Sequence, residues 1–320
     1  MKNKLPRYGG DIMSRTYGAN QDFKVVGYYP CWVPDQLEKV DFSVLTHVNY
    51  AFAIPTAEGT LLPLRNPETA RKLVAAAHEN GAKAMIVVGG WDYQDVLLEH
   101  TFELATDTPS KRKNLADEII ALCLSFDFDG VDVDWEHPRV GTPSAGQYED
   151  LMLDLSRRLH EKGKLLTSAV TSGATYEGDI LYDAAAQSDR VLGACDWINV
   201  MAYDAVMEGD HSSYEFAVNC SQYWKNQRGL PADKVVLGLP FYARVRGGAY
   251  GEILNRVPDA YQKDLAILDG EKAYYNGIPT IQKKTAYAKE NLGGVMIWEL
   301  TQDSLDKKKS LLTAIGGIAN

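Results

Sequence analysis

Eight short runs of apolar and β-branched residues recur along this chain of 320 residues, and segments with helical periodicity separate most of them. Such an alternation is typical of a parallel sheet, because each helix carries the chain back to the start of the next strand. A spacing of about 30 to 45 residues suits one strand, one helix and two loops. We therefore predict an α/β fold, a single (β/α)₈ TIM barrel with its active site at the C-terminal ends of the strands. The eight runs are Val25–Tyr29, Leu45–Phe52, Ala84–Val88, Val131–Trp135, Leu165–Thr171, Trp197–Met201, Val235–Leu239 and Val295–Trp298.

Capping residues, first-turn prolines and apolar periodicity predict helices between these strands. Ser144 and Gln147 resemble a capping box for one of them. No Gly/Ser-rich or Pro-rich linker divides the chain, so we expect residues 1–22 to be an N-terminal extension and residues 23–320 to form one barrel. The expected helices cover Asn66–Asn80, Thr108–Phe126, Ser144–Gly163, Tyr214–Gln227, Thr280–Asn291 and Ser304–Ile315.

The charge and the apolar segments exclude several classes of partner. The chain has 43 acidic and 33 basic residues, a formal net charge of -10, whereas a nucleic-acid binder needs a basic surface. No window of about 20 apolar residues predicts a membrane-spanning helix. Residues 1–22 contain no apolar segment typical of a secretion signal. The sequence leaves two localisations open: the cytoplasm, or secretion after removal of a signal.

The cysteines and histidines show no metal or redox motif. The four cysteines are far apart, and the six histidines include no pair four residues apart. We expect no metal and no cofactor, and free, partly buried thiols, with one disulfide still possible. The cysteines are Cys31, Cys123, Cys195 and Cys220.

The fourth strand carries the most informative chemistry. Side chains two residues apart on a strand share one face, so Asp132, Asp134 and Glu136 point the same way, into the barrel, and Glu136 lies at the C-terminal end. Like charges that are close together and partly desolvated raise one another's pKa, which produces the protonated carboxyl that a general acid needs. Two other interpretations are a Mg²⁺ or Ca²⁺ site and a loop of solvated acids, and the apolar flanking residues disfavour the loop.

The segment Asp129–Glu136 resembles the DxxDxDxE signature of glycoside hydrolase family 18, the chitinase family, in its bacterial form. The resemblance extends over residues 23 to 315 because motifs at six other strand ends agree in order. In two places the chain departs from the family pattern: Val87 replaces a serine that donates to Asp132, a role that Tyr28 could take, and Ala243 replaces a glycine. The six motifs are Gly27–Tyr29, Asn49–Phe52, Gly89–Trp91, Met201–Asp204, Gly238–Arg244 and Gly293–Trp298.

The resemblance implies catalysis with retention and without a nucleophile from the enzyme. Glu136 is then the general acid, and the substrate's own 2-acetamido oxygen attacks the anomeric carbon to give an oxazolinium ion. Asp134 orients the acetamide, Asp132 shares a proton with Asp134, and Tyr203 donates to the acetamido oxygen. The other expected substrate-binding residues are Asp204, Trp298, Met201, Tyr242, Arg244, Trp91, Tyr28 and Phe52.

Separate expectations apply to the individual tryptophans and to Asp129. Trp135 is expected to pack in the core, and Asp129 to have a structural role at the start of its strand. Trp91 is balanced between core packing and a sugar platform, whereas Trp298 is expected to form the floor of the site. The sequence does not decide whether Trp32 lines the site.

The resemblance makes chitin and N-acetylglucosamine oligosaccharides the expected substrates, and we expect a monomer. The segment from Val245 to about Thr280 is too short for the subdomain that larger family members insert, which favours an open groove and endo cleavage. The alternatives are an endo-β-N-acetylglucosaminidase acting on N-glycans or peptidoglycan, a non-hydrolytic chitinase-like lectin, and a metal-dependent hydrolase. The sequence does not indicate the preferred chain length or activity on crystalline chitin.

Overall fold

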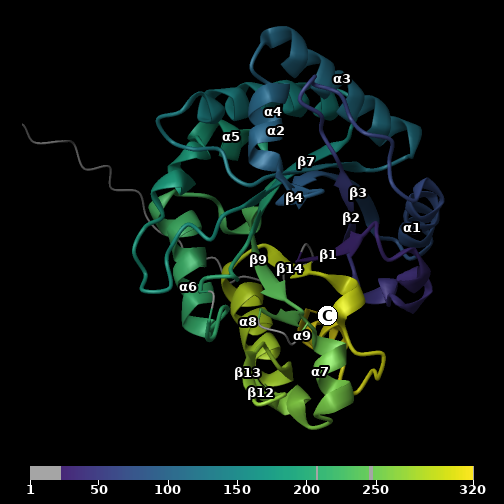
Figure 1. Ribbon diagram of the computed structural model, residues 1–320, viewed down its shortest axis with the longest axis vertical. Helices are drawn as coiled ribbons and strands as arrows, with labels where there is room; N and C mark the ends of the chain where they lie inside the picture. The colour runs from purple at the N-terminus through teal and green to yellow at the C-terminus, as the bar shows by residue number, and fades with distance from the viewer. Residues whose placement is uncertain (1–22, 207, 245–247, 320) are drawn as a thin grey trace, which may run out of the picture.

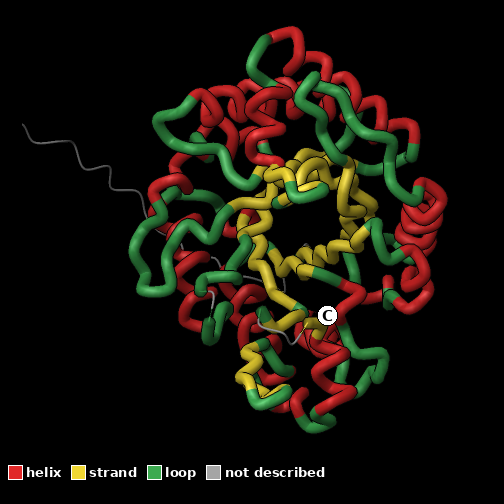
Figure 2. Tube along the Cα trace, in the orientation of Figure 1, coloured by secondary structure: helices red, strands yellow, loops and turns green. Residues whose placement is uncertain are grey.

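Eight parallel strands close into a barrel in the computed structural model, which describes residues 23–206, 208–244 and 248–319. Neighbouring strands follow the order β1-β14-β9-β8-β7-β6-β3-β2, and Figure 2 shows them as a ring inside the helices. The predicted α/β barrel is therefore confirmed, and the expected extension over residues 1–22 lies outside the described residues. The strands are β1 (Lys24–Pro30), β2 (His47–Ala53), β3 (Lys83–Gly90), β6 (Gly130–Trp135), β7 (Leu165–Val170), β8 (Trp197–Val200), β9 (Val235–Pro240) and β14 (Gly294–Trp298).

Every predicted run contains one strand of this ring, but some bounds differ. The second strand begins at His47 and not at Leu45, because Phe42–Val44 forms a 3-10 turn and the Leu45 N–H donates to the carbonyl of Phe42. The fifth ends at Val170, one residue before the predicted Thr171. The periodicity thus located each strand, and only local hydrogen bonds decided where it starts and ends.

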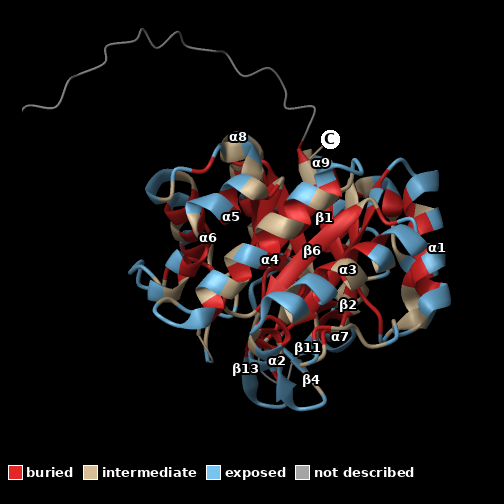
Figure 3. Cartoon of the chain, turned by 90° about the horizontal axis from the view of Figure 1, so that it is seen from above, coloured by how far each residue is buried: buried red, intermediate tan, exposed pale blue. Residues whose placement is uncertain are grey.

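Helices surround the ring and turn their exposed faces outward (Figures 1 and 3). Five of the six expected helices appear close to their predicted bounds, the fourth ending in a short π-helical turn (Tyr223–Gln227). Three shorter helices were not predicted: α2, α5 and α7. The described helices are α1 (Pro67–Glu79), α2 (Leu98–Ala105), α3 (Pro109–Ser125), α4 (Pro143–His160), α5 (Asp189–Ala194), α6 (Tyr214–Gln222), α7 (Tyr250–Arg256), α8 (Ile278–Asn291) and α9 (Leu311–Ala319).

Two expected helix starts are wrong. Helix α4 begins two residues earlier than a Ser144 capping box allows, because the Thr142 hydroxyl caps it and accepts from the Ser144 N–H. The last helix starts at Leu311 and not at Ser304, because the Asp303 carboxylate accepts from the backbone N–H groups of Leu311 and Leu312. In both cases the residue that caps the helix is not the one from which the sequence pattern predicted the helix start.

Short elements complete the mouth of the barrel. The hairpin β4–β5 (Asp92–Tyr93 and Val96–Leu97) follows β3, and β10–β11 (Tyr242–Ala243 and Gly248–Ala249) follows β9. The segment expected to be too short for an inserted subdomain holds α7 and the hairpin β12–β13 (Leu265–Leu268 and Glu271–Tyr274) in its described part. Figure 3 shows β4, β11, β13, α2 and α7 gathered at one end of the molecule.

The core has two parts. The larger fills the space between the strands and the surrounding helices, and all four cysteines lie buried in it as free thiols, as expected. The smaller lies inside the barrel and includes Tyr28, Val87, Trp197 and Met296. Apolar side chains therefore fill the interior below the carboxyl groups of β6. No helix in the described ranges is both long and apolar enough to traverse a lipid bilayer.

Two Asp–His pairs close the opposite end of the barrel. The Asp129 carboxylate accepts from the Ala84 N–H of β3 and lies 2.9 Å from His78 Nε2 at the end of α1. Asp196 repeats this arrangement with the Leu166 N–H and with His160 at the end of α4. Asp129 thus has the structural role expected for it.

A buried lysine holds the segment that follows β8. Lys284 of α8 is fully buried, and its ammonium donates to the Ser212 carbonyl at 2.6 Å, the Ser212 hydroxyl at 2.8 Å and the Asn276 side-chain oxygen at 2.6 Å. The Ser212 hydroxyl in turn donates to the carbonyl of Ala202. All three donors of the ammonium have acceptors, so the cation is tolerated inside the protein and fixes the segment that carries Tyr203 and Asp204.

We predict that Lys284 makes stability rise with pH. Burial lowers its pKa from 10.5 to about 8, so between these values the unfolded chain still binds a proton that the folded protein has lost. This stabilisation is present above the unfolded pKa and lost as the pH falls through 8. The free energy of unfolding of the wild type relative to Lys284→Met should therefore increase by about 2 kcal/mol between pH 7 and 9.5 in urea titrations.

The control is Lys225→Met, which removes a partly exposed lysine that donates to the carbonyl of Asn291. Its free energy of unfolding relative to the wild type should stay constant over the same range. If the free energy of unfolding of the wild type relative to Lys284→Met stays constant or decreases over this range, burial does not lower the pKa of Lys284 and the prediction is wrong.

Candidate active site

A cavity of about 1030 Å³ opens at the C-terminal ends of the strands, the end at which barrels of this kind place their active sites. Ten of the twelve expected site residues line it: Tyr28, Phe52, Trp91, Asp134, Glu136, Met201, Tyr203, Asp204, Arg244 and Trp298. The other two, Asp132 and Tyr242, lie directly behind this lining and hydrogen bond to it. Three peptide bonds at the mouth are cis: Ala51–Phe52, Glu136–His137 and Trp298–Glu299.

Asp132 is fully buried at the bottom of the site and is held by three donors. The Tyr28 hydroxyl donates to Oδ2 at 2.6 Å, while Thr167 Oγ1 at 2.5 Å and Asn199 Nδ2 at 3.1 Å donate to Oδ1. Burial raises the pKa of Asp132, and these hydrogen bonds oppose the rise. Val87 pairs with Asp132 in register and packs in the interior, so Tyr28 supplies the bond that Val87 cannot.

Thr167 and Asn199 were not among the expected site residues. Both come from inward positions of the strands that follow β6, and Thr167 is the register partner of Asp132 on β7. The sequence signal that could have identified them is a polar residue at an inward position of an otherwise apolar strand.

Asp134 lies one step nearer the mouth and is only 5% exposed. Its Oδ1 is buried and has no hydrogen-bond partner among the described residues. Burial raises its pKa well above the usual range, and the charges of Glu136 and Asp132 raise it further. A buried acceptor without a donor is costly, so this oxygen is suited to a donor that a ligand brings.

Glu136 has a carboxyl group poised to give up a proton near neutral pH. Burial raises its pKa to about 7, with a contribution from the charge of Asp204. His137, which was not expected from the sequence, lines the cavity with Nε2 3.8 Å from Glu136 Oε2. Burial lowers the pKa of His137 to about 4, so between about pH 4 and pH 7 its ring is neutral while Glu136 carries its proton.

Asp204 stays ionised beside this acid. Burial acts to raise its pKa, but hydrogen bonds from His211 and Tyr242 and the charge of Arg244 hold it below the usual value. The Tyr242 hydroxyl donates to Oδ1 at 2.9 Å, and Arg244 Nη1 lies 2.8 Å from Oδ2. Two neighbouring carboxyl groups with pKa values pushed apart are typical of an acid and its electrostatic partner.

Tyr203 offers a hydroxyl donor to the cavity. The contact that the structure gives this hydroxyl is 3.8 Å to Met296 Sδ, a weak acceptor. Burial raises its pKa well above 10, and the nearby carboxylates Asp134 and Glu136 add to the rise. The phenol therefore keeps its proton and can donate it in a hydrogen bond to a ligand.

Aromatic rings form one wall of the cavity. The Trp298 ring centroid lies 5.7 Å from those of Tyr28 and Phe52 and 6.5 Å from that of Trp32. Trp32 is 44% exposed, so the structure places it in the cavity wall, which the sequence left undecided. Apolar ring faces of this kind suit the C–H faces of sugar rings.

Of the other two tryptophans near the site, one lines the cavity and the other packs in the core. Trp91 is 55% exposed and lines the cavity, so the core interpretation of this residue is wrong. Gly89 lies two residues before Trp91. Its φ is +119° and a Cβ there would come within 2.1 Å of the Asp134 carbonyl oxygen, so only glycine fits. Trp135 is buried and stacks on Phe102 at 4.7 Å, as expected for a core residue.

Over residues 23–206, 208–244 and 248–319, no three or more His, Cys, Asp or Glu side chains come together in a way that could hold a metal ion.

Comparisons with known proteins agree on one family. The model of the glycosyl hydrolases family 18 matches residues 24–303. The chain is similar to the GH18 chitinase ChiB from the chitin utilization locus of Flavobacterium johnsoniae, with 30% identity, a TM-score of 0.79 and 94% of each chain covered. It is also similar to a chitinase from Bacteroides thetaiotaomicron, with 28% identity, a TM-score of 0.79, and 92% of this chain and 95% of the other covered.

A curated relative differs in kind and in length. The chitinase-like effector of Moniliophthora roreri is 31% identical over 262 residues, which cover 74% of this chain and 60% of the effector. The chain thus spans less than two thirds of that relative's own length.

We predict that Asp204 sets part of the proton affinity of Glu136. Replacing Asp204 by Asn removes a negative charge that favours the protonated form of Glu136, so the pKa of Glu136 should fall below its wild-type value of about 7. Carboxyl ¹³C chemical shifts of glutamate-labelled protein, followed over pH, would measure both midpoints. Asp107→Asn is the matched control, because Asp107 also pairs with a cation, Lys111, but does not line the cavity. A Glu136 midpoint that stays or rises in Asp204→Asn would contradict the prediction.

Proposed function

The chain belongs to the glycosyl hydrolases family 18, and on that premise we propose that it is an endo-acting chitinase. It hydrolyses β-1,4 bonds between N-acetylglucosamine units with retention of configuration, through an oxazolinium intermediate. One observation carries the proposal: Glu136, an acid that holds its proton up to near neutral pH, directly follows the strand on which a buried carboxyl oxygen of Asp134 has no partner among the described residues.

In the first step Glu136 donates its proton to the glycosidic oxygen, and the bond from that oxygen to the anomeric carbon breaks. The 2-acetamido oxygen of the same sugar attacks the anomeric carbon, so the positive charge passes to an oxazolinium ring. Asp134 Oδ1 accepts the acetamide N–H and stabilises this charge, while the Tyr203 hydroxyl donates to the acetamido oxygen and aims it. The aromatic wall with Trp298 supports the sugar ring.

In the second step Glu136, now ionised, takes a proton from a water molecule that attacks the same carbon. The oxazolinium ring opens, the acetamide is restored, and Glu136 is again protonated. The first step requires the acid form, so the rate should fall as the pH rises through a pKa of about 7. The charge of the fully buried Asp132 contributes to the raised pKa of Asp134.

One other function has a specific observation in its favour. The relative from Moniliophthora roreri is a chitinase-like effector, and a lectin that binds without cleaving would use the same aromatic wall. An N-glycan or peptidoglycan substrate would use the same acetamide chemistry. The pKa of Glu136 supports turnover over binding alone, since a lectin has no need of an acid that titrates near neutral pH.

We predict that Glu136→Gln lowers kcat on N-acetylglucosamine hexasaccharide by a factor of about 100 to 10,000, because the general acid is removed while the shape of the site is kept. Chromatography of the products over time measures the rate. Glu290→Gln, at an exposed position of α8, should leave it unchanged, and so should EDTA. Activity that persists in Glu136→Gln refutes the mechanism, and activity that EDTA abolishes supports a metal. Binding of the oligosaccharide by the wild type without cleavage supports the lectin.

We further predict the form of the products. Because the acetamide shields one face of the anomeric carbon and water attacks the other, the first products should be β-anomers in ¹H NMR, and the fully deacetylated hexamer should not be cleaved. Internal cleavage in an open groove should release dimers, trimers and tetramers together. An α-anomer would overturn the oxazolinium step, and release of dimers alone from one end would overturn the endo assignment.

A further inference from the structure

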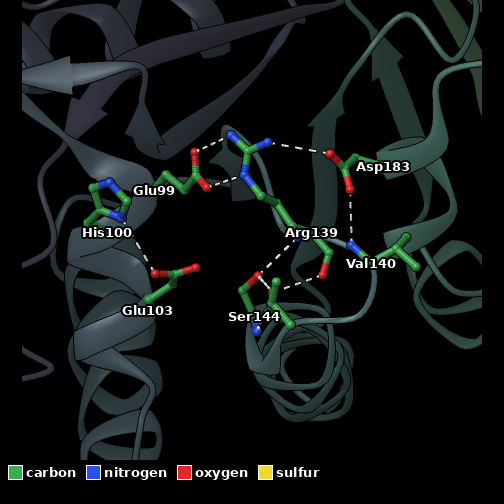
Figure 4. A network of polar contacts seen from close by, with 8 residues as sticks. Glu99, His100, Glu103, Arg139, Val140, Ser144 and Asp183 are labelled. Atoms are coloured by element: carbon green, nitrogen blue, oxygen red, sulfur yellow. Dashed lines mark hydrogen bonds and ion pairs between the residues drawn. The ribbon is translucent and has the colours of Figure 1, made fainter.

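Arg139 lies three residues after Glu136, in the connection between β6 and α4, and takes no part in the proposed chemistry. Its guanidinium forms a fork with the carboxylate of Glu99: Nε donates to Oε1, and Nη2 donates to Oε2 at 2.8 Å. Nη1 reaches the other way, to Asp183 Oδ2 at 3.4 Å. Figure 4 shows this arginine between the two carboxylates, which come from different parts of the chain.

The Glu99 side of the contact reaches the segment after β3. Glu99 lies in the first turn of α2 and is only 5% exposed, and the hydrogen bonds from Arg139 lower its pKa. Helix α2 directly follows the β4–β5 hairpin, and Trp91 and Tyr93, at the start of that hairpin, line the cavity. A buried carboxylate held by an arginine fork has a defined position, so it can transmit order to the hairpin.

The Asp183 side reaches the segment after β7. Asp183 belongs to a 3-10 turn, Tyr182–Ala186, and its Oδ1 also accepts from the Val140 N–H at 3.1 Å. The segment before this turn, including Thr175 and Leu181, also lines the cavity. Asp183 therefore joins this segment to the β6–α4 connection through both a side chain and a backbone group.

The backbone of Arg139 is held as well. Its N–H donates to the Ser144 hydroxyl at 2.9 Å, and its carbonyl accepts from the Thr142 hydroxyl at 3.0 Å. Both partners belong to the start of α4, a helix packed against the barrel. The guanidinium thus projects from a fixed point, and the two carboxylates on either side are positioned relative to that point.

We infer that Arg139 is a positioning residue: it ties together the three cavity-lining segments that follow β3, β6 and β7, and so sets how the groove presents a glycosidic bond to Glu136. This inference rests on the proposed function. The physical reason is that His137, beside Glu136, lies within the tied connection, and a displacement of about 1 Å at a reacting group can lower a rate up to 100-fold.

The chain contains a matched arginine for comparison. Arg158 of α4 also bridges two carboxylates, Asp117 at 2.6 Å and Asp154 at 3.1 Å. It links α3 and α4 on the outside of the barrel, and none of these three residues lines the cavity. If the loss of any arginine that bridges two carboxylates lowered activity, variants of Arg139 and of Arg158 would both show the loss.

The experiment compares Arg139→Met, Arg139→Lys and Arg158→Met by amide hydrogen exchange and by kinetics on the hexasaccharide. We expect Arg139→Met to speed exchange at least about tenfold in segments 92–97, 137–142 and 175–183, and Arg158→Met to leave all three unchanged. For folded enzyme, kcat of Arg139→Met should fall about tenfold or more, with a smaller change in KM. Arg139→Lys keeps the charge but not the fork, and should not restore kcat.

A second variant keeps the test decisive if Arg139→Met unfolds, because the lone substitution leaves Glu99 buried without its cation. The double variant Glu99→Gln with Arg139→Met removes that charge and should still show fast exchange in the three segments. Exchange that rises only in 137–142, full rescue by lysine, or a kcat within twofold of the wild type would overturn the inference. Hydrogen exchange needs no substrate, so it decides the inference even if the wild type cleaves no chitin oligosaccharide.

Discussion

Three carboxyl groups on one face of a single strand have to be accommodated inside a barrel that is otherwise filled with apolar side chains. Taking a carboxylate out of water costs several kcal/mol unless donors replace the lost hydration. Asp132, the deepest of the three, receives donors from β7 and β8 on one side of β6 and from β1 on the other side. That set of donors assembles only when the barrel closes in the correct register.

In the described structure, fewer donors reach the carboxyl groups of Asp134 and Glu136 near the mouth than reach that of Asp132 at the bottom of the barrel. Asp134 keeps one oxygen without a partner in the described structure, and burial raises the pKa of both Asp134 and Glu136. Asp204 is the exception, because Arg244 and two hydrogen bonds keep it ionised at the same mouth. One strand and one neighbouring loop therefore hold protonated and ionised carboxyl groups side by side, the arrangement that acid catalysis requires.

Two cations outside the cavity hold the segments that shape it. Lys284 binds the segment after β8 from behind, in a fully buried site where all three of its donors have acceptors. Arg139 joins the segments after β3, β6 and β7 from the outer side of the mouth. Several of the reacting groups lie on loops that follow the barrel strands and not on the strands themselves. The hydrogen bonds and ion pairs that hold these loops therefore decide how accurately the groups are placed.

The sequence by itself determined the eight strands, most of the helices between them and the inward face of Asp132, Asp134 and Glu136, because these depend on periodicity and spacing within one segment. The family was indicated by a resemblance carried by motifs at seven strand ends. It did not determine the cap of α4, the start of α9, or the roles of Thr167, Asn199 and His137. Each of these depends on a partner that is distant in the chain or outside the expected pattern. Tertiary structure also decided that Trp91 and Trp32 line the cavity while Trp135 is buried, since burial depends on what packs against a ring.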